Sequence, residues 1–456
     1  MGHRPLAATI DPMPQARSVT QPPQPPQPPS RSRAAVASLA SIRGLQAFRH
    51  RNFRIYYSGQ LVSLVGTWMQ TVAQSWLVLE LTDNPLALGF VAAAQFLPVV
   101  VLGLFGGLIA DGLPKRQTLI VVQAIAMLLA FALFGLTVSG AVEVWHVLVL
   151  AALLGMTNAI EFPTRQSFAI EMVGRADIGN AVALGAAAFN GARVVGPALA
   201  GLAIGTLGIA PAFLINGISY LAVLAGLFAL RQREMEAPPR LARPRTVAAV
   251  VANLAEGLGF VRRTDIVLLA TVVLGLAATF GMNFSVLVPP LARDVLGSDA
   301  AGFGFLMAAS GVGSLLAALG IAFSGRTSPI IIVVGALTMG LAEIVLGISR
   351  WYPLSLAMML FAGLGGIAMA ATANTTIQLS VPDELRGRVM SVYTTAFAGS
   401  VPIGGLVMGA IASSLGADVA MSLGGTATAA VGVAGILWLR RIRARARDGS
   451  VRRPSA

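Results

Sequence analysis

Apolar residues occur in twelve long runs, separated by short segments that contain glycine, proline or charged residues. A helix of about 20 apolar residues spans the roughly 30 Å of hydrocarbon in a bilayer. We therefore predict an all-α polytopic membrane protein with twelve transmembrane helices. The expected spans are 55–81, 85–110, 117–139, 144–163, 178–207, 209–230, 265–290, 301–324, 328–349, 352–378, 387–414 and 418–439.

The longest charged segment between spans divides these helices into two sets of six. Residues 49–230 and 265–440 are expected to form two bundles, joined by a cytoplasmic loop at 231–264. Residues 1–48 contain a repeat of glutamine and proline that is typical of an extended, disordered tail. Residues 441–456 are rich in arginine and are expected to form a basic tail.

Lysine and arginine lie almost entirely on one side of this predicted topology. With a cytoplasmic N-terminus, all of the 32 lysines and arginines lie on the cytoplasmic side except Arg193, Arg293 and Arg350. Cytoplasmic loops of membrane proteins carry such an excess of positive charge. No apolar segment precedes residue 55, so a cleaved signal peptide is not expected. Both termini are therefore predicted to be cytoplasmic.

Composition excludes a soluble globular protein. The chain is 56% hydrophobic and only 11% charged, and its mean hydropathy is +0.77, whereas soluble domains carry about 25% charged residues. The absence of cysteine excludes disulfides and thiolate metal sites. The net charge of +13 is concentrated in the loops and tails of one side, so no nucleic-acid partner is expected.

The two predicted bundles share a weak sequence repeat. Gly44 and Arg49, before the first span, match Gly257 and Arg262, before the seventh, at a constant offset. A second constant offset relates Val173 to Val381, Gly179 to Gly387, Ala188 to Ala396, Phe189 to Phe397, Gly191 to Gly399, Gly196 to Gly404 and Gly201 to Gly409. Parallel repeats of this kind occur in transporters that hold substrate near the midplane between their halves. We interpret the chain as two pseudo-symmetric six-helix bundles.

A short charged hairpin joins the second and third spans. It has the pattern Gly107-x-x-x-Asp111-x-x-Pro114-Lys115-Arg116 and contains the only lysine of the chain. Its carboxylate can bind a helix end or a cation and be released when helices move. Two roles remain open: a gate that forms and breaks, or a topogenic loop whose positive charge keeps it in the cytoplasm.

Several motifs resemble those of a known transporter family. They are the hairpin, Thr67-Trp68-Met69-Gln70 with Gln74-Ser75-Trp76, Ala94-Gln95-Phe96-Leu97-Pro98, Pro163-Thr164-Arg165-Gln166 and Pro382-Asp383-Glu384-Leu385-Arg386. With two sets of six spans, residues 44–440 resemble the drug:proton antiporter branch of the major facilitator superfamily, which contains enterobactin exporters and macrolide efflux pumps. The resemblance implies an exporter of amphipathic small molecules, such as drugs or siderophores, in the bacterial inner membrane.

The gate implied by this resemblance would be confined to the N-terminal half. A third basic residue is usual in the hairpin, but Gln117 occupies its position, and the matching loop at 323–326 has no acid. We expect Asp111 to pair with Arg165 and to cap the start of the helix near Arg386. The expected gate residues are Asp111, Lys115, Arg116, Arg165, Arg386 and Arg388.

Arg193 lies near the middle of the predicted span 178–207. An arginine at this depth costs at least about 2.5 kcal/mol, so it must be solvated by a partner. A structural salt bridge and a role in substrate binding or proton coupling both remain open. The same span carries small residues and a proline that resemble the helix-5 motif of antiporters and allow close approach and bending: Gly191, Gly196, Pro197 and Gly201.

Polar side chains also form a stripe along the first span. Its members share one helix face because they are spaced four, three and four apart: Ser63, Thr67, Gln70 and Gln74. We expect this face to point into the bundle, where it either lines a substrate cavity or bonds to neighbouring helices.

Further polar candidates lie within other spans: Asn158, Glu161, Asn283, Asn374 and Thr375. Glu161 precedes Arg165 by four residues, which favours an ion pair within one helix. Glu343 lies near the end of a helix that the resemblance places at the periphery, and it is set aside as a candidate.

No enzyme active site is indicated. The sequence has no phosphate-binding loop and no zinc-protease or nucleophile-elbow motif, and its histidines, His3, His50 and His146, are far apart. We expect no metal and no cofactor, with a proton gradient as the energy source. The expected partners are a small-molecule substrate and membrane lipids, and the protein is expected to be a monomer. Import or uniport of another metabolite, and a channel or sensor built on the same bundle, are the alternatives.

Overall fold

The computed structural model describes residue 2 and residues 43–235, 247–324 and 328–451; at 43, 103–112, 247–250, 324 and 446–451 only the backbone is described. Every regular element in these ranges is a helix. The N-terminal half contains η1 (Arg43–Arg49), α2 (Arg51–Thr82), α3 (Pro85–Gly112), α4 (Lys115–Val138), α5 (Val144–Leu207), α6 (Ala210–Phe228) and η2 (Gln232–Glu234). The C-terminal half contains α7 (Val247–Arg263), α8 (Asp265–Phe280), α9 (Phe284–Pro290), the π-helix η3 (Leu291–Val295), α10 (Ala300–Ser324), α11 (Ile330–Ile348), α12 (Tyr352–Ser380), α13 (Asp383–Leu415) and α14 (Ala417–Val451).

The all-α membrane fold predicted from the hydrophobic runs is confirmed. In the described part of the chain, ten helices are long and apolar enough to cross a membrane. Helix α2 is not among them, and its polar stripe lowers its hydropathy. Helix α5 counts once, although its backbone breaks at Gly174, where φ is 71°. The number of twelve spans therefore remains a prediction.

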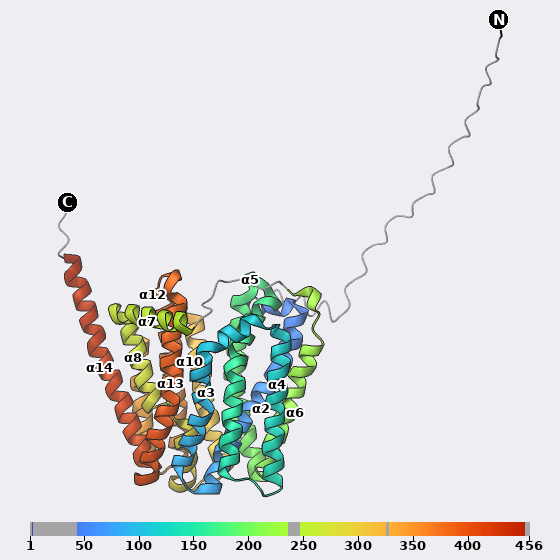
Figure 1. Ribbon diagram of the computed structural model, residues 1–456. Coiled ribbons are helices and arrows are strands. Elements are labelled where there is room, and N and C mark those ends of the chain that lie inside the picture. The colour runs from blue at the N-terminus through green and yellow to red at the C-terminus, as the bar shows by residue number, and fades with distance from the viewer. Residues whose placement is uncertain (1, 3–42, 236–246, 325–327, 452–456) are drawn as a thin grey trace.

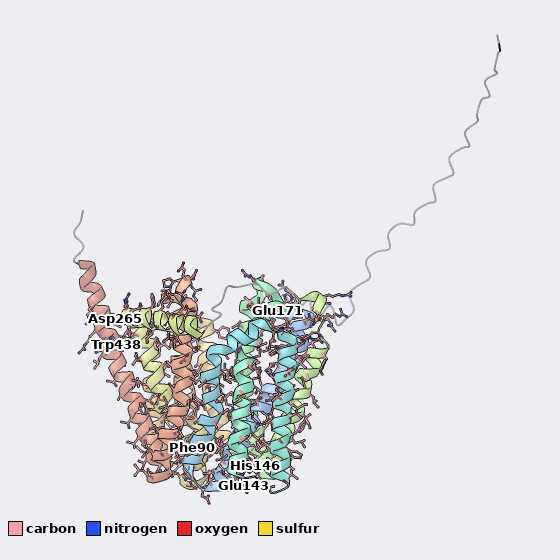
Figure 2. The ribbon with its side chains drawn as sticks, in the orientation of Figure 1. Phe90, Glu143, His146, Glu171, Asp265 and Trp438 are labelled. Atoms are coloured by element: carbon pink, nitrogen blue, oxygen red, sulfur yellow. The ribbon has the colours of Figure 1, made fainter. Side chains whose placement is uncertain are left out.

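The two halves lie side by side (Figure 1), the N-terminal one in blue to green and the C-terminal one in yellow to red. We call the side with the described chain ends, Arg43 and Val451, the terminal side, and the other the opposite side. Glu171 and Asp265 lie at the terminal side, whereas His146 lies at the opposite side (Figure 2). The first part of α5, residues 144–173, thus crosses the bundle once, and after Gly174 the second part, residues 175–207, returns.

The turn between α2 and α3 shows how the sequence sets helix ends. Asp83 adopts a left-handed conformation, φ 50°, directly after α2. The Asn84 side chain then accepts a hydrogen bond of 2.9 Å from the Leu86 backbone N–H, and Pro85 occupies the first position of α3. Asparagine is a preferred N-cap, and proline fits the first turn because no partner is needed for its nitrogen. The helices therefore end and begin close to the limits of the expected spans 55–81 and 85–110.

Within each half, helices pack through small residues. A methyl group placed on Gly59 of α2 would lie 2.5 Å from the Ala222 carbonyl oxygen of α6. In the C-terminal half, a methyl group on Gly340 of α11 would lie 2.6 Å from the Gly425 carbonyl oxygen of α14. These separations leave room only for glycine. Helices in membranes associate through such close backbone contacts because lipid supplies no hydrophobic driving force between them.

The sequence repeat is visible in the packing at the terminal side. The Asn180 side chain donates to the Gly44 carbonyl at 2.7 Å and accepts from the Ala47 N–H at 2.8 Å, which attaches η1 to α5. At the matching positions of the C-terminal half, Gly257 of α7 packs against the backbone of Arg388 on α13. Each bundle therefore begins with a short helix that rests on the start of its fifth span. Part of the segment predicted as a central loop is thus helical.

Candidate functional site

Two helix pairs make the most extensive contacts between the halves, α5 with α10 and α3 with α13. In the first pair, a methyl group on Gly304 would lie 2.5 Å from the Pro197 carbonyl oxygen and 2.7 Å from the Gly201 Cα. A methyl group on Gly311 would lie 2.5 Å from the Arg193 carbonyl oxygen. We call this contact, from Gly201 to Arg193, the α5–α10 seam. Its backbones touch, so it excludes water and solute along its length.

The second pair repeats this geometry. A methyl group on Gly89 of α3 would collide with the Gly405 carbonyl of α13. A methyl group on Gly409 would lie 3.1 Å from the Pro85 carbonyl oxygen. We call this contact the α3–α13 seam. Phe90, beside Gly89, lies at the opposite side (Figure 2), so the seam closes that side of the molecule.

Side chains add to this closure between the halves. The rings of Trp76 on α2 and Phe303 on α10 are stacked with centroids 5.9 Å apart. Arg293 of η3 donates to Asp83, at the end of α2, over 2.6 Å. Both contacts lie close to the ends of α2 and α10 that face the opposite side. The halves are therefore joined there by packing, stacking and an ion pair.

Toward the terminal side, glycines of the same helices lack such close contacts. A methyl group on Gly185 or Gly191 of α5, on Gly320 of α10 or on Gly399 of α13 would meet no heavy atom within 4 Å. The close contacts of both seams thus end part of the way across the bundle. The two seams thus close the opposite side, whereas these glycines toward the terminal side face open space.

Charged side chains at the terminal side pair within their own half. These pairs are Lys115 with Glu171 (2.7 Å), His50 with Asp177 (2.9 Å), Arg165 with Glu161 (3.1 Å), Arg388 with Glu256 (2.5 Å), and Arg386 with Asp383. Arg116 donates to the Leu227 carbonyl at 2.7 Å. The Asp111 side chain lies outside the described residues, as does Arg326. The expected gate contacts of Asp111 therefore remain a prediction, whereas the expected Glu161–Arg165 pair is present.

Arg193 lies where the α5–α10 seam ends. Its guanidinium carbon is 5.5 Å from the centroid of the Trp68 ring on α2. Trp68 in turn meets Phe189 edge to face, with centroids 5.6 Å apart. The Arg193 Nε is buried and has no hydrogen-bond partner, and among the described residues no ion pair involves this side chain. The structural salt bridge that the sequence left open is absent from the described part of the chain.

The helix-5 motif has divided roles. Gly196 packs against Trp68, since a methyl group there would lie 2.5 Å from the Trp68 Cβ. Gly201 and Pro197 form the seam with α10. Gly191 faces open space. Three of the four motif residues therefore set helix spacing, and they hold Arg193 beside Trp68.

The polar stripe of α2 meets α6. The Gln70 carbonyl oxygen accepts a buried hydrogen bond of 2.6 Å from the Asn216 side chain. Ser219 donates to the Asn216 side chain at 3.2 Å. Thr67 donates to the Ser63 backbone carbonyl at 2.9 Å. Of the two roles left open for the stripe, bonding between helices is the one that Gln70 has in this structure; Gln74 is also buried.

The weaker candidates are dispersed. Asn283 is buried, donates to the Thr279 carbonyl at 2.7 Å and precedes α9. Asn374 accepts a bond from Gln378 on its own helix. Asn158 is half-buried. The structure does not bring these three residues together with Arg193.

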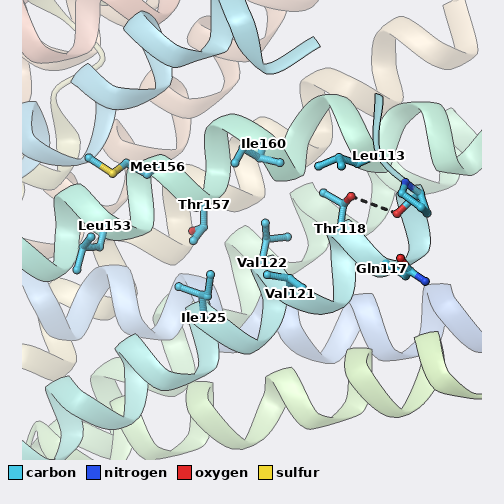
Figure 3. A pocket seen from close by; sticks show the side chains of 11 residues that line it. Leu113, Gln117, Thr118, Val121, Val122, Ile125, Leu153, Met156, Thr157 and Ile160 are labelled. Carbon is cyan, nitrogen blue, oxygen red and sulfur yellow. Dashed lines mark hydrogen bonds between the residues drawn. The ribbon is translucent and has the colours of Figure 1, made fainter. Parts of the chain in front are cut away.

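A groove of about 520 Å³ lies between α4 and the first part of α5 (Figure 3). Its lining is almost entirely apolar, and the Thr118 hydroxyl donates to the Pro114 carbonyl at its end. Gln117 contributes to its rim. It contains neither Arg193 nor the stripe of α2, so it is not the candidate substrate site.

Two residues with unusual environments were missed by sequence reasoning. Asn216 carries no signal in the sequence beyond being polar within an apolar span. Glu343, which was set aside, is only 1% exposed, and both its carboxyl oxygens are buried without a hydrogen-bond partner. The described residues contain no cluster of histidine and acidic side chains that could hold a metal ion.

Comparison with known proteins identifies related chains. Residues 42–454 match the family described as transmembrane secretion effectors. The multidrug efflux pump Tap of Mycolicibacterium fortuitum is 29% identical over 364 residues, which is 78% of this chain and 88% of Tap. The staphyloferrin A transporter of Staphylococcus aureus is 23% identical over 386 residues, 82% of this chain and 93% of that protein.

Solved structures of low sequence identity share the fold. The nucleoside transporter NupG superposes with a TM-score of 0.64 at 11% identity, covering 85% of this chain and 99% of NupG. A POT family transporter in complex with 5-aminolevulinic acid superposes with a TM-score of 0.67 at 12% identity, covering 86% of this chain and 97% of that one. The fold of the chain is thus that of these transporters.

Proposed function

Because the chain belongs to the transmembrane secretion effector family of the major facilitator superfamily, we propose that it exports amphipathic small molecules, such as drugs or siderophores, by alternating access. The names of its relatives, a multidrug efflux pump and a siderophore transporter, support this substrate class. We also propose a proton gradient as its energy source, the bacterial inner membrane as its location, and a monomer surrounded by lipid as its working form.

The charge asymmetry supports a cytoplasmic location for the terminal side. In that orientation, the two seams close the outer face, and the proposed path between the halves would open to the cytoplasm. An exporter in this state accepts substrate from the cytoplasm or the inner leaflet. Opening of both seams, with closure at the terminal side, would then release the substrate outside.

The observation that carries the proposal is the unpaired Arg193 at the end of the α5–α10 seam. Its contact with Trp68 contributes about 0.5 to 2 kcal/mol, whereas a central arginine costs at least about 2.5 kcal/mol. The aromatic ring alone therefore does not offset the cost of this charge. An anionic group on the substrate would supply the missing partner, and the apolar part of the substrate would pack against Trp68 and Phe189.

The charged hairpin at 107–116 would act in the step of the transport cycle in which the terminal side closes. In the open state, Arg165, Arg386 and Arg388 all bond to carboxylates of their own half. When the terminal side closes, we propose that Asp111 competes for Arg165 and reaches the start of α13. Because these ion pairs join residues of the same half, they do not hold the two halves together at the terminal side. This arrangement fits an inward-open state.

Substrate accumulation in cells that lack endogenous pumps tests the function. Cells with the wild-type protein should accumulate less of an anionic amphipathic dye than cells without it, and a protonophore should remove the difference. Arg193→Ala should abolish export at equal membrane abundance, and Arg193→Lys should retain part of it, because lysine keeps the charge but not the planar fork. Arg231→Ala, at an exposed ion pair, serves as the matched control.

Two outcomes would contradict the proposal. Normal export by Arg193→Ala would exclude its role in substrate binding. Flux of small ions down their gradient, without uphill movement of the dye, would indicate a channel.

A further inference from the structure

Glu343 is a buried acid that the proposed path does not use. It lies on α11, and a methyl group on Gly425 of α14 would lie 2.8 Å from the Glu343 Cβ. The side chain is 1% exposed. Neither of its carboxyl oxygens has a hydrogen-bond partner. The acid is therefore enclosed between α11 and α14 without a compensating group.

No side chain described near Glu343 is a cation. Helix α11 packs against α14, α12 and α8. Apart from Glu343, the titratable and charged groups of these four elements and their ends whose side chains are described are Arg350, Asp418, Tyr352, Asp265, Arg440, Arg441, Arg443 and Arg445. Arg350 is bonded to Asp418 over 2.6 Å at the opposite end of the interface. Asp265 and the arginines of α14 lie at the terminal end, where Asp265 meets Arg445 at 3.9 Å.

An ionised carboxylate in this position would be strongly destabilising. Removing a charge from water without a partner costs several kcal/mol. Protonation removes that cost, because the reaction of a carboxylate with one proton gives a neutral carboxylic acid. The surroundings of Glu343 therefore favour the neutral acid over the carboxylate. Glu161, the other buried acid of the spans described here, differs because it is bonded to Arg165.

Two polar residues of α14, Asp418 and Ser422, lie nearer the opposite side than this acid. Glu343 lies five residues before the end of α11 at Ile348, which is about 7.5 Å along the helix. One turn further out, a methyl group on Gly347 would collide with the Ser422 hydroxyl. Ser422 donates to the Asp418 carbonyl at 2.9 Å. Asp418, Ser422 and Glu343 thus follow one another inward along the interface of α11 and α14.

We propose that Glu343 is a proton-binding site, loaded from the opposite side along Asp418 and Ser422, and that its proton is the one exchanged for substrate. This inference rests on the proposed proton-coupled export. Loss of the proton would leave a charge between α11 and α14, where the Gly340–Gly425 contact leaves no room for water. The C-terminal half must then repack to solvate the charge. Protonation of Glu343 is in this way linked to the helix packing of the C-terminal half, which contributes α10 to the α5–α10 seam.

Transport by purified protein in proteoliposomes tests the coupling. Glu343→Gln keeps the size of the side chain and imitates the protonated acid. We expect the rate of uphill export driven by a pH gradient to fall at least tenfold in this variant. The rate of substrate exchange across the membrane without a gradient should stay within twofold of wild type. Glu143→Gln, at an exposed helix cap, is the matched control and should retain both activities.

Labelling by the hydrophobic reagent dicyclohexylcarbodiimide tests the site itself, since it modifies protonated carboxyls in apolar surroundings. Mass spectrometry should locate the adduct on Glu343, and Ser422→Ala should slow its formation. Uphill export by Glu343→Gln at the wild-type rate would contradict the proposed role of Glu343 in proton coupling. Loss of substrate exchange in a folded Glu343→Gln variant would contradict it as well. Absence of the adduct from wild type would overturn the site. If wild type exports nothing but Glu343 is labelled, the proposed function fails and the proton site stands.

Discussion

The α5–α10 and α3–α13 seams join the halves with the same backbone geometry, but only one of them carries a charge. In the repeat, Gly201 of the first seam corresponds to Gly409 of the second, and the same offset pairs Arg193 with Val401. Close approach is needed in both seams because both must exclude water at the opposite side. In the proposed function, an unpaired arginine is needed once, where substrate binds. The closure is therefore present twice, whereas the proposed substrate-binding charge lies in the N-terminal half alone.

The largest effect is expected from leucine at a seam glycine. Gly304→Leu and Gly89→Leu each place a side chain where a methyl group would already collide with the backbone of the facing helix. Overpacking costs about 1 to 3 kcal/mol or more, so each variant should disfavour the closed opposite side by about tenfold and reduce export strongly.

A single cysteine at Gly191 or at its counterpart Gly399 reports this change, because the chain has no cysteine of its own. Both positions face open space, so both should react with an impermeant maleimide from the terminal side. The leucine variants should lower this reactivity equally. A response in only one seam would show that the two are not equivalent.

The next largest effect should distinguish the α5–α10 seam from the α3–α13 seam. Arg193→Val gives the first seam the residue that the second has at the matching position, and it should abolish uphill export of an anionic substrate without loss of folded protein. Val401→Ala should leave export within about twofold, since it removes no charge. Transport assays at matched membrane abundance compare the two. Equal losses in both variants would contradict the asymmetry between seams.

A smaller effect is expected away from the seams. Gln70→Leu breaks the buried bond to Asn216 and leaves that amide unpaired, so it should lower stability by roughly 0.6 to 2 kcal/mol. The range of exported compounds should stay the same, because Gln70 faces α6. Thermal unfolding in detergent and export of a compound panel measure the two effects. A changed substrate range at unchanged stability would indicate that Gln70 contacts substrate and does not serve mainly to join α2 to α6.

Much of the fold follows from the sequence because hydrophobic length and turn residues are local signals. The turn at Asp83, Asn84 and Pro85 is an example, since each residue has a conformational preference that fixes a helix end. A break within α5 was also expected, since the spans 144–163 and 178–207 leave a charged segment between them. The structure confines this break to Gly174, and the helix resumes directly after it.

The candidate site was only partly predictable. Arg193 was identified because a charge in an apolar span is a strong signal by itself. The partner of Gln70 could not be found, since spacing along α2 gives the face but not the neighbouring helix. Glu343 was set aside on its position along the chain, whereas its burial depends on how closely Gly340 and Gly425 bring α11 and α14 together.

The measurement that tests the account most directly is binding of a matched pair of compounds to the purified protein. The two compounds should share one amphipathic aromatic scaffold and differ only in a carboxylate or its neutral amide. Calorimetry should give at least about tenfold tighter binding of the carboxylate by wild type, because a desolvated charge pair is worth 1.4 kcal/mol or more. Arg193→Ala should bind both compounds equally. Equal affinities in wild type, or an unchanged preference in Arg193→Ala, would contradict the assignment of Arg193 as the group that receives substrate between the halves.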